Sequence, residues 1–131
     1  LNPNAMRRLF PPLLLSALAL FSCAAPEGGG TLDTRAFQQA LATANVQLID
    51  VRTPAEYAEG HIDGALNLDW TGGVLEQRMG TLDKTRPVLL YCASGRRSAA
   101  AREVMIGAGF ANVQDLDSGI TAWRNAGLPV K

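Results

Sequence analysis

From about Thr31 onward, short apolar runs alternate with stretches of helical spacing. The run Pro87–Cys92 (PVLLYC) is continuously apolar, which is typical of a strand buried on both faces of a sheet. Strands are predicted at 46–51, 64–68, 87–92 and 112–116, and helices at 31–44, 54–58, 74–80, 97–108 and 120–125. This alternation predicts a single α/β domain, an open parallel β-sheet with helices on both faces.

The first 30 residues follow a different pattern. Met6-Arg7-Arg8 is positively charged, and the apolar stretch 9–21 that follows is too short to span a bilayer but suits a secretory signal. Leu20-Phe21-Ser22-Cys23 resembles a bacterial lipobox, in which the cysteine is lipidated and becomes the new N-terminus. An ordinary signal peptide cut elsewhere and an uncleaved anchor are the alternatives. The predicted organisation is a lipoprotein signal peptide at 1–22, a flexible glycine-rich tether at 23–30 and a folded domain at 31–131.

Composition and charge narrow the classes of function. The 131 residues are 47% hydrophobic, and 12 basic residues balance 12 acidic ones, so no nucleic-acid partner is expected. No cluster of His and Cys has metal-ligand spacing, and no metal or cofactor is expected. If Cys23 carries lipid, Cys92 is the only remaining thiol and no disulfide can form.

Cys92 stands where a predicted strand meets a predicted helix. Ligands in open α/β sheets lie beyond the carboxyl ends of the strands, and Cys92 lies at such an end. The dipole of helix 97–108, inward N–H groups of residues 93–97 and the charges of Arg96 and Arg97 would all lower the pKa of a thiol there. A cysteine that only ends a core strand is the alternative, but it needs no cationic turn.

The segment Cys92–Ser98 (CASGRRS) resembles the active-site loop of the rhodanese, or sulfurtransferase, family. Three further segments resemble the motifs of that family in the same order, between about residues 31 and 130. They are Asp50-Val51-Arg52 with Glu56-Tyr57, then GHIDGALNL at 60–68 with Asp63 where proline is usual, and SGITAW at 118–123 with Ser118 in place of a glycine. The resemblance implies the rhodanese-like α/β fold and transfer of sulfane sulfur through a cysteine persulfide.

The resemblance also implies roles for individual residues. Cys92 would carry the sulfur, and Arg97 would pair with the anionic oxygens of the donor. Ala93, Ser94, Gly95 and Arg96 would form the rest of the substrate loop, with Asp50 and Arg52 bracing it by ion pairing and hydrogen bonds. His61 and Trp123 are expected to be structural, while Trp70 and Met79 are placed at the mouth of the pocket.

In the family that the sequence resembles, the length of the active-site loop distinguishes sulfurtransferases from phosphatases. Six residues run from Cys92 to Arg97, the length that accompanies sulfur transfer in the family. Phosphatases of the same fold have one more residue before the arginine, and here that later position is Ser98, which has no guanidinium group. A cysteine phosphatase or arsenate reductase is therefore disfavoured.

The expected function is a sulfurtransferase that uses thiosulfate or a related donor and passes sulfur to a thiol, cyanide or a protein. The alternatives are a persulfide carrier fed by another protein and a redox sensor. A monomer is expected, lipid-anchored through Cys23 in the periplasm or cell envelope. Ala24 after the lipidated cysteine favours the outer membrane if the organism has one.

Overall fold

A computed structural model describes residues 28–131, so the predicted signal peptide at 1–22 and the residues 23–27 of the predicted tether lie outside the described part of the chain. Five parallel strands form one sheet in the order β1-β5-β4-β2-β3. The strands are β1 (Gly28–Leu32), β2 (Gln47–Asp50), β3 (Leu66–Asn67), β4 (Val88–Tyr91) and β5 (Asn112–Leu116). The predicted open parallel sheet is confirmed.

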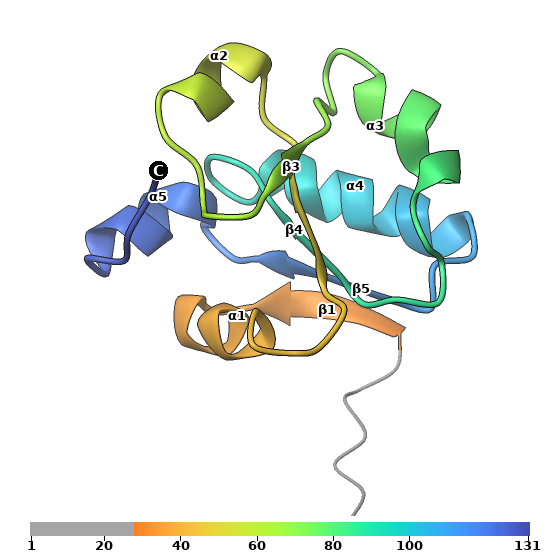
Figure 1. Cartoon of the computed structure of the whole chain (residues 1–131), viewed down its shortest axis with the longest axis horizontal. Coiled ribbons are helices and arrows are strands. Elements are labelled where there is room, and N and C mark those ends of the chain that lie inside the picture. The colour runs from red at the N-terminus through yellow and green to blue at the C-terminus, as the bar shows by residue number, and fades with distance from the viewer. Residues whose placement is uncertain (1–27) are drawn as a thin grey trace, which may run out of the picture.

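Helices cover both faces of the sheet (Figure 1). The helices are α1 (Thr34–Ala40), α2 (Pro54–Ala58), α3 (Val74–Arg78), a 3-10 turn (Met79–Thr81), α4 (Arg96–Gly107) and α5 (Gly119–Asn125). The buried residues of α3 and α4 belong to one core cluster, and those of α1 and α5 belong to the other. Among residues 28–131, none of the helices combines the length and the apolar character needed to cross a bilayer.

Alternation along the strands creates these two cores. Successive side chains of a strand point to opposite faces of the sheet. In β4, Leu90 belongs to the core with Met105 of α4, whereas Leu89 and Tyr91 belong to the core with Phe37 of α1. Every residue of β4 is buried, which is why this strand is apolar throughout.

The predictions for the N-terminal side of the domain were wrong at two places. Gly28–Gly30 was assigned to the tether and Thr31 to a helix, but both belong to β1, which pairs with β5 from Gly28↔Asn112 to Leu32↔Leu116. The helix begins only at Thr34, where the Asp33 side chain accepts the Ala36 N–H at 2.8 Å as an N-cap. The hydrogen bonds to β5 impose the extended conformation, and composition alone gives no sign of that partner.

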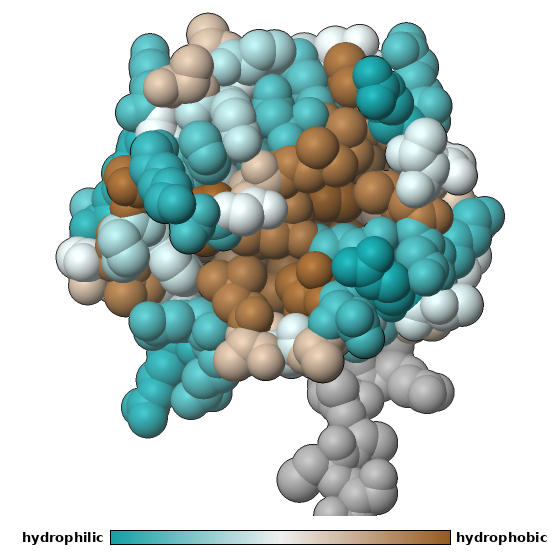
Figure 2. Space-filling view, viewed as in Figure 1, coloured by the Kyte–Doolittle hydropathy of each residue, from teal (hydrophilic) through white to brown (hydrophobic). Residues whose placement is uncertain are grey.

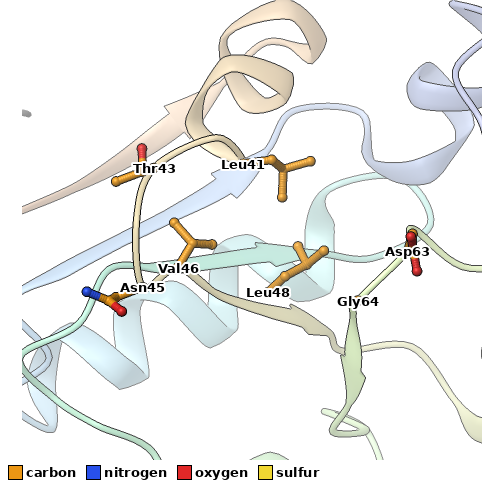
Figure 3. A pocket seen from close by; sticks show the side chains of 7 residues that line it. All are labelled: Leu41, Thr43, Asn45, Val46, Leu48, Asp63 and Gly64. Atoms are coloured by element: carbon orange, nitrogen blue, oxygen red, sulfur yellow. The ribbon is translucent and has the colours of Figure 1, made fainter.

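One face of the molecule is hollowed and apolar. Figure 2 shows hydrophobic residues gathered in a hollow at the centre of this face, and β2 and β3 run through the middle of the same view in Figure 1. A pocket of about 330 Å³ lies near the amino ends of β2 and β3 (Figure 3). Its lining residues are Leu41, Thr43, Asn45, Val46, Leu48, Asp63 and Gly64. Ligands of open α/β sheets bind at the carboxyl ends of the strands. This pocket lies at the opposite end of the sheet.

Candidate active site

The loop that follows β4 places Cys92 at the carboxyl edge of the sheet. β4 ends at Tyr91, and residues 92–95 lead directly into α4. The first turn of α5 holds the loop from below, since Ile120 N–H donates to Cys92 O at 2.9 Å and Thr121 N–H donates to Ala93 O at 3.2 Å. The start of the loop is therefore fixed by two backbone hydrogen bonds from another element.

Gly95 turns its N–H toward the sulfur. This N–H lies 3.1 Å from Cys92 Sγ, the distance of a hydrogen bond to sulfur. Gly95 has φ of +99°, a conformation that costs any residue with a Cβ atom. A Cβ atom at this position would also lie 3.1 Å from Ser118 N. Glycine is thus needed at the fourth position of the loop for the donor to reach the sulfur.

The environment of Cys92 makes its thiol acidic. The side chain is only 1% exposed, and burial by itself raises the pKa of a thiol. Hydrogen bonds from Ser98, Gly95 and Ser94 outweigh burial, so the pKa of Cys92 lies below its ordinary value. A thiolate is the nucleophilic form of cysteine, and the lowered pKa extends the presence of this form to lower pH than for an ordinary cysteine.

In the structure Arg97 forms an ion pair with Glu56, which the sequence did not predict. Its Nη1 lies 2.9 Å from Glu56 Oε2 and its Nη2 lies 3.1 Å from Glu56 Oε1, a bidentate ion pair between α4 and α2. The Arg97 hydrogen bond lowers the pKa of Glu56, and Glu56 in turn raises the pKa of Arg97. The guanidinium expected to meet the donor is thus held by a carboxylate, while Arg96 is exposed at the start of α4.

Glu56 has two tasks at once. Its side chain also accepts the Thr53 N–H at 3.0 Å, while the Thr53 hydroxyl accepts the Glu56 N–H at 3.3 Å, which completes a capping box at the start of α2. Both Glu56 and Arg97 lie in the segments that carry the family resemblance. Their pairing could have been found only by asking what neutralises each charge in the fold.

Asp50 and Arg52 form a buried ion pair at the end of β2, where Asp50 lies opposite Tyr91 of β4. Arg52 Nη2 lies 2.6 Å from Asp50 Oδ2, and the two side chains are 3% and 0% exposed. Arg52 also donates to Gly60 O at 2.7 Å, and its guanidinium lies 5.6 Å from the ring centre of Tyr91. Within residues 28–131 these hydrogen bonds tie β2 to the segment after α2. The expected hydrogen bonds or ion pairs from Asp50 and Arg52 to residues 93–97 are not formed among the described residues.

His61 and Trp123 have the structural surroundings expected for them. The His61 ring stacks on Tyr57 with ring centres 3.8 Å apart, and its Nδ1 lies 3.1 Å from the Tyr57 carbonyl oxygen. Trp123 packs edge-on against Phe37 at 6.4 Å in the core between α1 and α5. These contacts explain both side chains without a part in catalysis.

Trp70 and Met79 pack against the hydrophobic core beside the site. Both are partly buried against the core cluster that contains Cys92 and Leu75 of α3. Their expected place at the mouth of the pocket stays a prediction, and their partial burial adds packing on the sheet face that carries α3. The segment between β3 and β4 therefore contributes packing to the site.

Two residues near the sulfur were missed as site residues. Ser98 Oγ lies 3.5 Å from Cys92 Sγ, and Asp115 Oδ2 lies 3.3 Å from Ser98 Oγ. Ser98 had been considered only as a position that lacks arginine. Asp115 lies in a strand with neighbours on both sides, and a charged residue in such a strand is a signal that could have been followed.

The site consists of a nucleophile and hydrogen-bond donors. No group of three His, Cys, Asp or Glu residues is placed to hold a metal ion in the described range 28–131. The thiolate can attack an electrophilic sulfur, and the N–H groups around it can stabilise negative charge on a bound anion. The fold and this loop together define an α/β protein that presents one activated cysteine at the carboxyl edge of its sheet.

Comparison with known proteins gives the family. Residues 33–126 match the family model described as "Rhodanese-like domain". The chain belongs to the rhodanese-like family. The match spans every element from α1 to α5 and includes the loop that carries Cys92.

Individual relatives agree with this assignment. The chain is 41% identical over 100 residues to a sulfurtransferase of Allochromatium vinosum, covering 76% of this chain and 92% of that protein. It is 34% identical over 101 residues to thiosulfate sulfurtransferase 16, chloroplastic, of Arabidopsis thaliana, covering 70% and 84%. The crystal structure of a rhodanese-related protein from Thermoplasma volcanium matches with a TM-score of 0.69 at 28% identity, covering 77% and 96%. Sulfur transfer is the general activity that these relatives support.

Proposed function

We propose that the protein transfers sulfane sulfur from thiosulfate, or a related donor, to a thiophilic acceptor through a persulfide on Cys92. One observation carries the proposal: Cys92 Sγ accepts the Gly95 N–H at 3.1 Å in a six-residue loop at the carboxyl edge of the sheet. The same donors that lower the pKa of the thiol suit a persulfide anion in its place.

The first half-reaction loads the enzyme. The Cys92 thiolate attacks the outer sulfur of thiosulfate, a new S–S bond forms, and the S–S bond of the donor breaks. Sulfite leaves with the electron pair, and the negative charge of the thiolate passes to the outer sulfur of the persulfide. Backbone N–H groups of the loop stabilise this charge as it develops.

The second half-reaction transfers the sulfur from the Cys92 persulfide to the acceptor. Cyanide, or the thiolate of an acceptor, attacks the outer sulfur of the persulfide. The S–S bond to Cys92 breaks, and the Cys92 thiolate is restored. Thiocyanate leaves when cyanide is the acceptor, and a small persulfide leaves when a thiol is the acceptor. No metal or redox cofactor enters either balance.

Charge at the loop bears on the choice of donor. Glu56 neutralises the charge of Arg97, and Ala93, the first residue of the loop after Cys92, is uncharged. The exposed positive charge of the loop therefore comes from Arg96. This favours a second candidate, in which a partner protein delivers the sulfur to Cys92 and free thiosulfate is a poor donor. The two candidates share the Cys92 persulfide and differ in the substrate that loads it.

The test is thiocyanate production from thiosulfate and cyanide by the full chain. We use a Cys23→Ser background, in which Cys92 is the sole cysteine, and compare it with the same chain carrying Cys92→Ala. Turnover that disappears with Cys92→Ala supports the proposal. Turnover that survives Cys92→Ala contradicts it. No turnover together with no persulfide on Cys92 after incubation with thiosulfate contradicts thiosulfate as the donor and leaves the protein-fed carrier.

We further propose that the protein is exported and anchored by lipid on Cys23 in the periplasm or cell envelope. The positively charged start, the apolar stretch 9–21 and the sequence LFSC at 20–23 support this proposal.

A further inference from the structure

Asp115 is a buried charge that the proposed reaction does not use. It lies in β5, it is 1% exposed, and its strand has neighbours on both sides in the sheet. A buried carboxylate is costly unless it is paired and hydrogen-bonded. The buried position of the Asp115 carboxylate is therefore not explained by apolar packing.

The two oxygens of Asp115 have different partners. Oδ1 accepts hydrogen bonds from Arg102 of α4 and from Thr31 Oγ1 of β1, the latter at 3.0 Å. Oδ2 has Ser98 Oγ as its hydrogen-bond partner among residues 28–131, at 3.3 Å. Arg102 and Thr31 thus secure one side of the carboxylate and aim the other side at Ser98.

Ser98 has one hydroxyl proton and three acceptors within reach. Its Oγ lies 3.2 Å from Gly95 O, 3.3 Å from Asp115 Oδ2 and 3.5 Å from Cys92 Sγ. A hydroxyl group donates one hydrogen bond at a time. Ser98 is fully buried, so water does not supply a substitute partner at its surface. The charge on Cys92 Sγ therefore decides which of the three acceptors receives the hydrogen bond from the Ser98 hydroxyl.

The charge on Sγ changes during the reaction. In the free enzyme the thiolate carries the negative charge on Sγ, which attracts the Ser98 hydroxyl. In the persulfide the negative charge sits on the outer sulfur, and Sγ is bonded and formally neutral. The hydroxyl then has a stronger acceptor in the carboxylate, because hydrogen bonds to charged groups exceed those to neutral ones.

We infer that Asp115 is a positioning residue that acts on Cys92 through Ser98 and favours the sulfur-loaded form over the free thiolate. In the thiolate form Ser98 turns to Sγ and leaves Asp115 Oδ2 without its donor. In the persulfide form the Ser98–Asp115 hydrogen bond is restored. This inference rests on the proposed function for its loaded state, but the connection between Asp115 and the thiol does not.

The other charged groups near the sulfur are accounted for. Arg97 of α4 lies close enough for Cys92 to raise its pKa, and Glu56 of α2 pairs with it. Arg102 of α4 is paired with Asp115 and also with Glu103. Asp115 is the carboxylate that reaches Cys92 through a single hydroxyl group.

The experiment uses the full chain in the Cys23→Ser background. The rate of alkylation by iodoacetamide between pH 5 and pH 10 gives the pKa of Cys92. The fraction of persulfide at a fixed ratio of thiosulfate to sulfite, measured by intact mass spectrometry, gives the loading equilibrium. The variants are Asp115→Asn, Ser98→Ala and the two combined. Asp117→Asn serves as the control, because it makes the same change of charge at an exposed site two residues away.

We expect Asp115→Asn to lower the pKa of Cys92 and to reduce the loading equilibrium constant roughly threefold or more, since threefold is near the low end of the net contribution of one hydrogen bond. Ser98→Ala raises the pKa of Cys92, since a donor to the thiolate is lost. In the Ser98→Ala background, Asp115→Asn has less than half of its effect on either quantity, and Asp117→Asn has none in any background.

Equal effects of Asp115→Asn with and without Ser98 would overturn the connection through the hydroxyl. So would an Asp115→Asn chain that is less stable but alkylates and loads like the parent. If Asp115→Asn does not fold, Ser98→Ala decides alone: a raised thiol pKa with little change in loading supports the inference, and a large shift toward persulfide overturns it. Failure of the parent to load from thiosulfate counts against the proposed donor, while the alkylation profiles still decide the connection.

Discussion

The chemistry of Cys92 depends on donors that its neighbours supply one by one. Burial opposes ionisation of the thiol, and Ser98, Gly95 and Ser94 reverse that effect. Each of these donors belongs to the loop or the first turn of α4. Single substitutions in this short segment should therefore change reactivity more than they change the fold.

Gly95→Ala tests the backbone donor. Alanine at φ of +99° costs about 1–2 kcal/mol of stability, and its Cβ atom would lie 3.1 Å from Ser118 N. We expect a lower melting temperature and a higher pKa of Cys92 by iodoacetamide alkylation. Gly107→Ala, at the open C-terminal end of α4, is the matched control and should be neutral or stabilising. A Gly95→Ala chain with an unchanged alkylation profile would show that this donor is dispensable.

The pH dependence of the thiol follows from the direction of its shift. Because the pKa of Cys92 is lowered on folding, its ionisation favours the folded state above the unfolded pKa of about 8.5, and this contribution is lost as pH falls through the folded value. Half-maximal alkylation of the native chain should therefore occur below about pH 8.5. The same chain in urea should return to the ordinary value. Native and unfolded profiles that coincide would contradict the assigned donors.

At the scale of elements, one ion pair joins α2 to α4 beside the site. Glu56 holds Arg97 by both nitrogens, and the remaining cation of the loop, Arg96, is exposed. The partners are 41 residues apart in sequence, so neither periodicity nor local spacing could reveal the pair. If thiosulfate is the donor, we expect the strength of its binding to depend on whether the Arg97 guanidinium is free or held by Glu56.

Glu56→Gln releases Arg97 with little damage to α2, because glutamine can also complete a capping box. With its guanidinium free, Arg97 can contact a dianion, and we expect KM for thiosulfate to fall roughly threefold, within the range of exposed ion pairs. Glu59→Gln removes the same charge at an exposed position of the same segment and should leave KM unchanged. A rise of KM in Glu56→Gln would mean that the held form of Arg97 is the one that serves binding.

The elements differ in how far the sequence predicts them. The strands β2, β4 and β5 and the helices α2, α4 and α5 were placed within a few residues, because each has a strong apolar pattern or a marked cap. β1 was missed, since Gly28–Gly30 has no side chains to form a pattern and takes its conformation from β5. The site shows the same division: the motifs located Cys92 and its loop, while the contacts of Arg97 and Asp115 come from residues distant in sequence.

For the whole molecule, the direction of the sheet places the start of β1 and the site at opposite ends of the sheet. All five strands are parallel, so Gly28, the first residue of β1, lies at the amino end of the sheet, and Cys92, which follows β4, lies at the carboxyl end. The pocket of Figure 3, which has a mixed polar and apolar lining, also lies near the amino ends of the strands. If the domain were attached to a membrane through its N-terminus, the loop that carries Cys92 would face away from that membrane.

The geometry of attachment makes the anchor testable. Because β1 begins at Gly28, four residues separate it from Cys23, and the five Cα–Cα steps between the two reach at most roughly 18 Å at full extension. A lipid on Cys23 would therefore keep the domain close to the membrane with Cys92 facing the water. We expect the full chain, expressed in bacteria that process lipoproteins, to fractionate with membranes and to incorporate labelled palmitate. Cys23→Ser should lose the label and Cys92→Ala should keep it. Membrane association without label in Cys23→Ser would indicate an uncleaved anchor, and a soluble, unlabelled parent chain would exclude both forms of attachment.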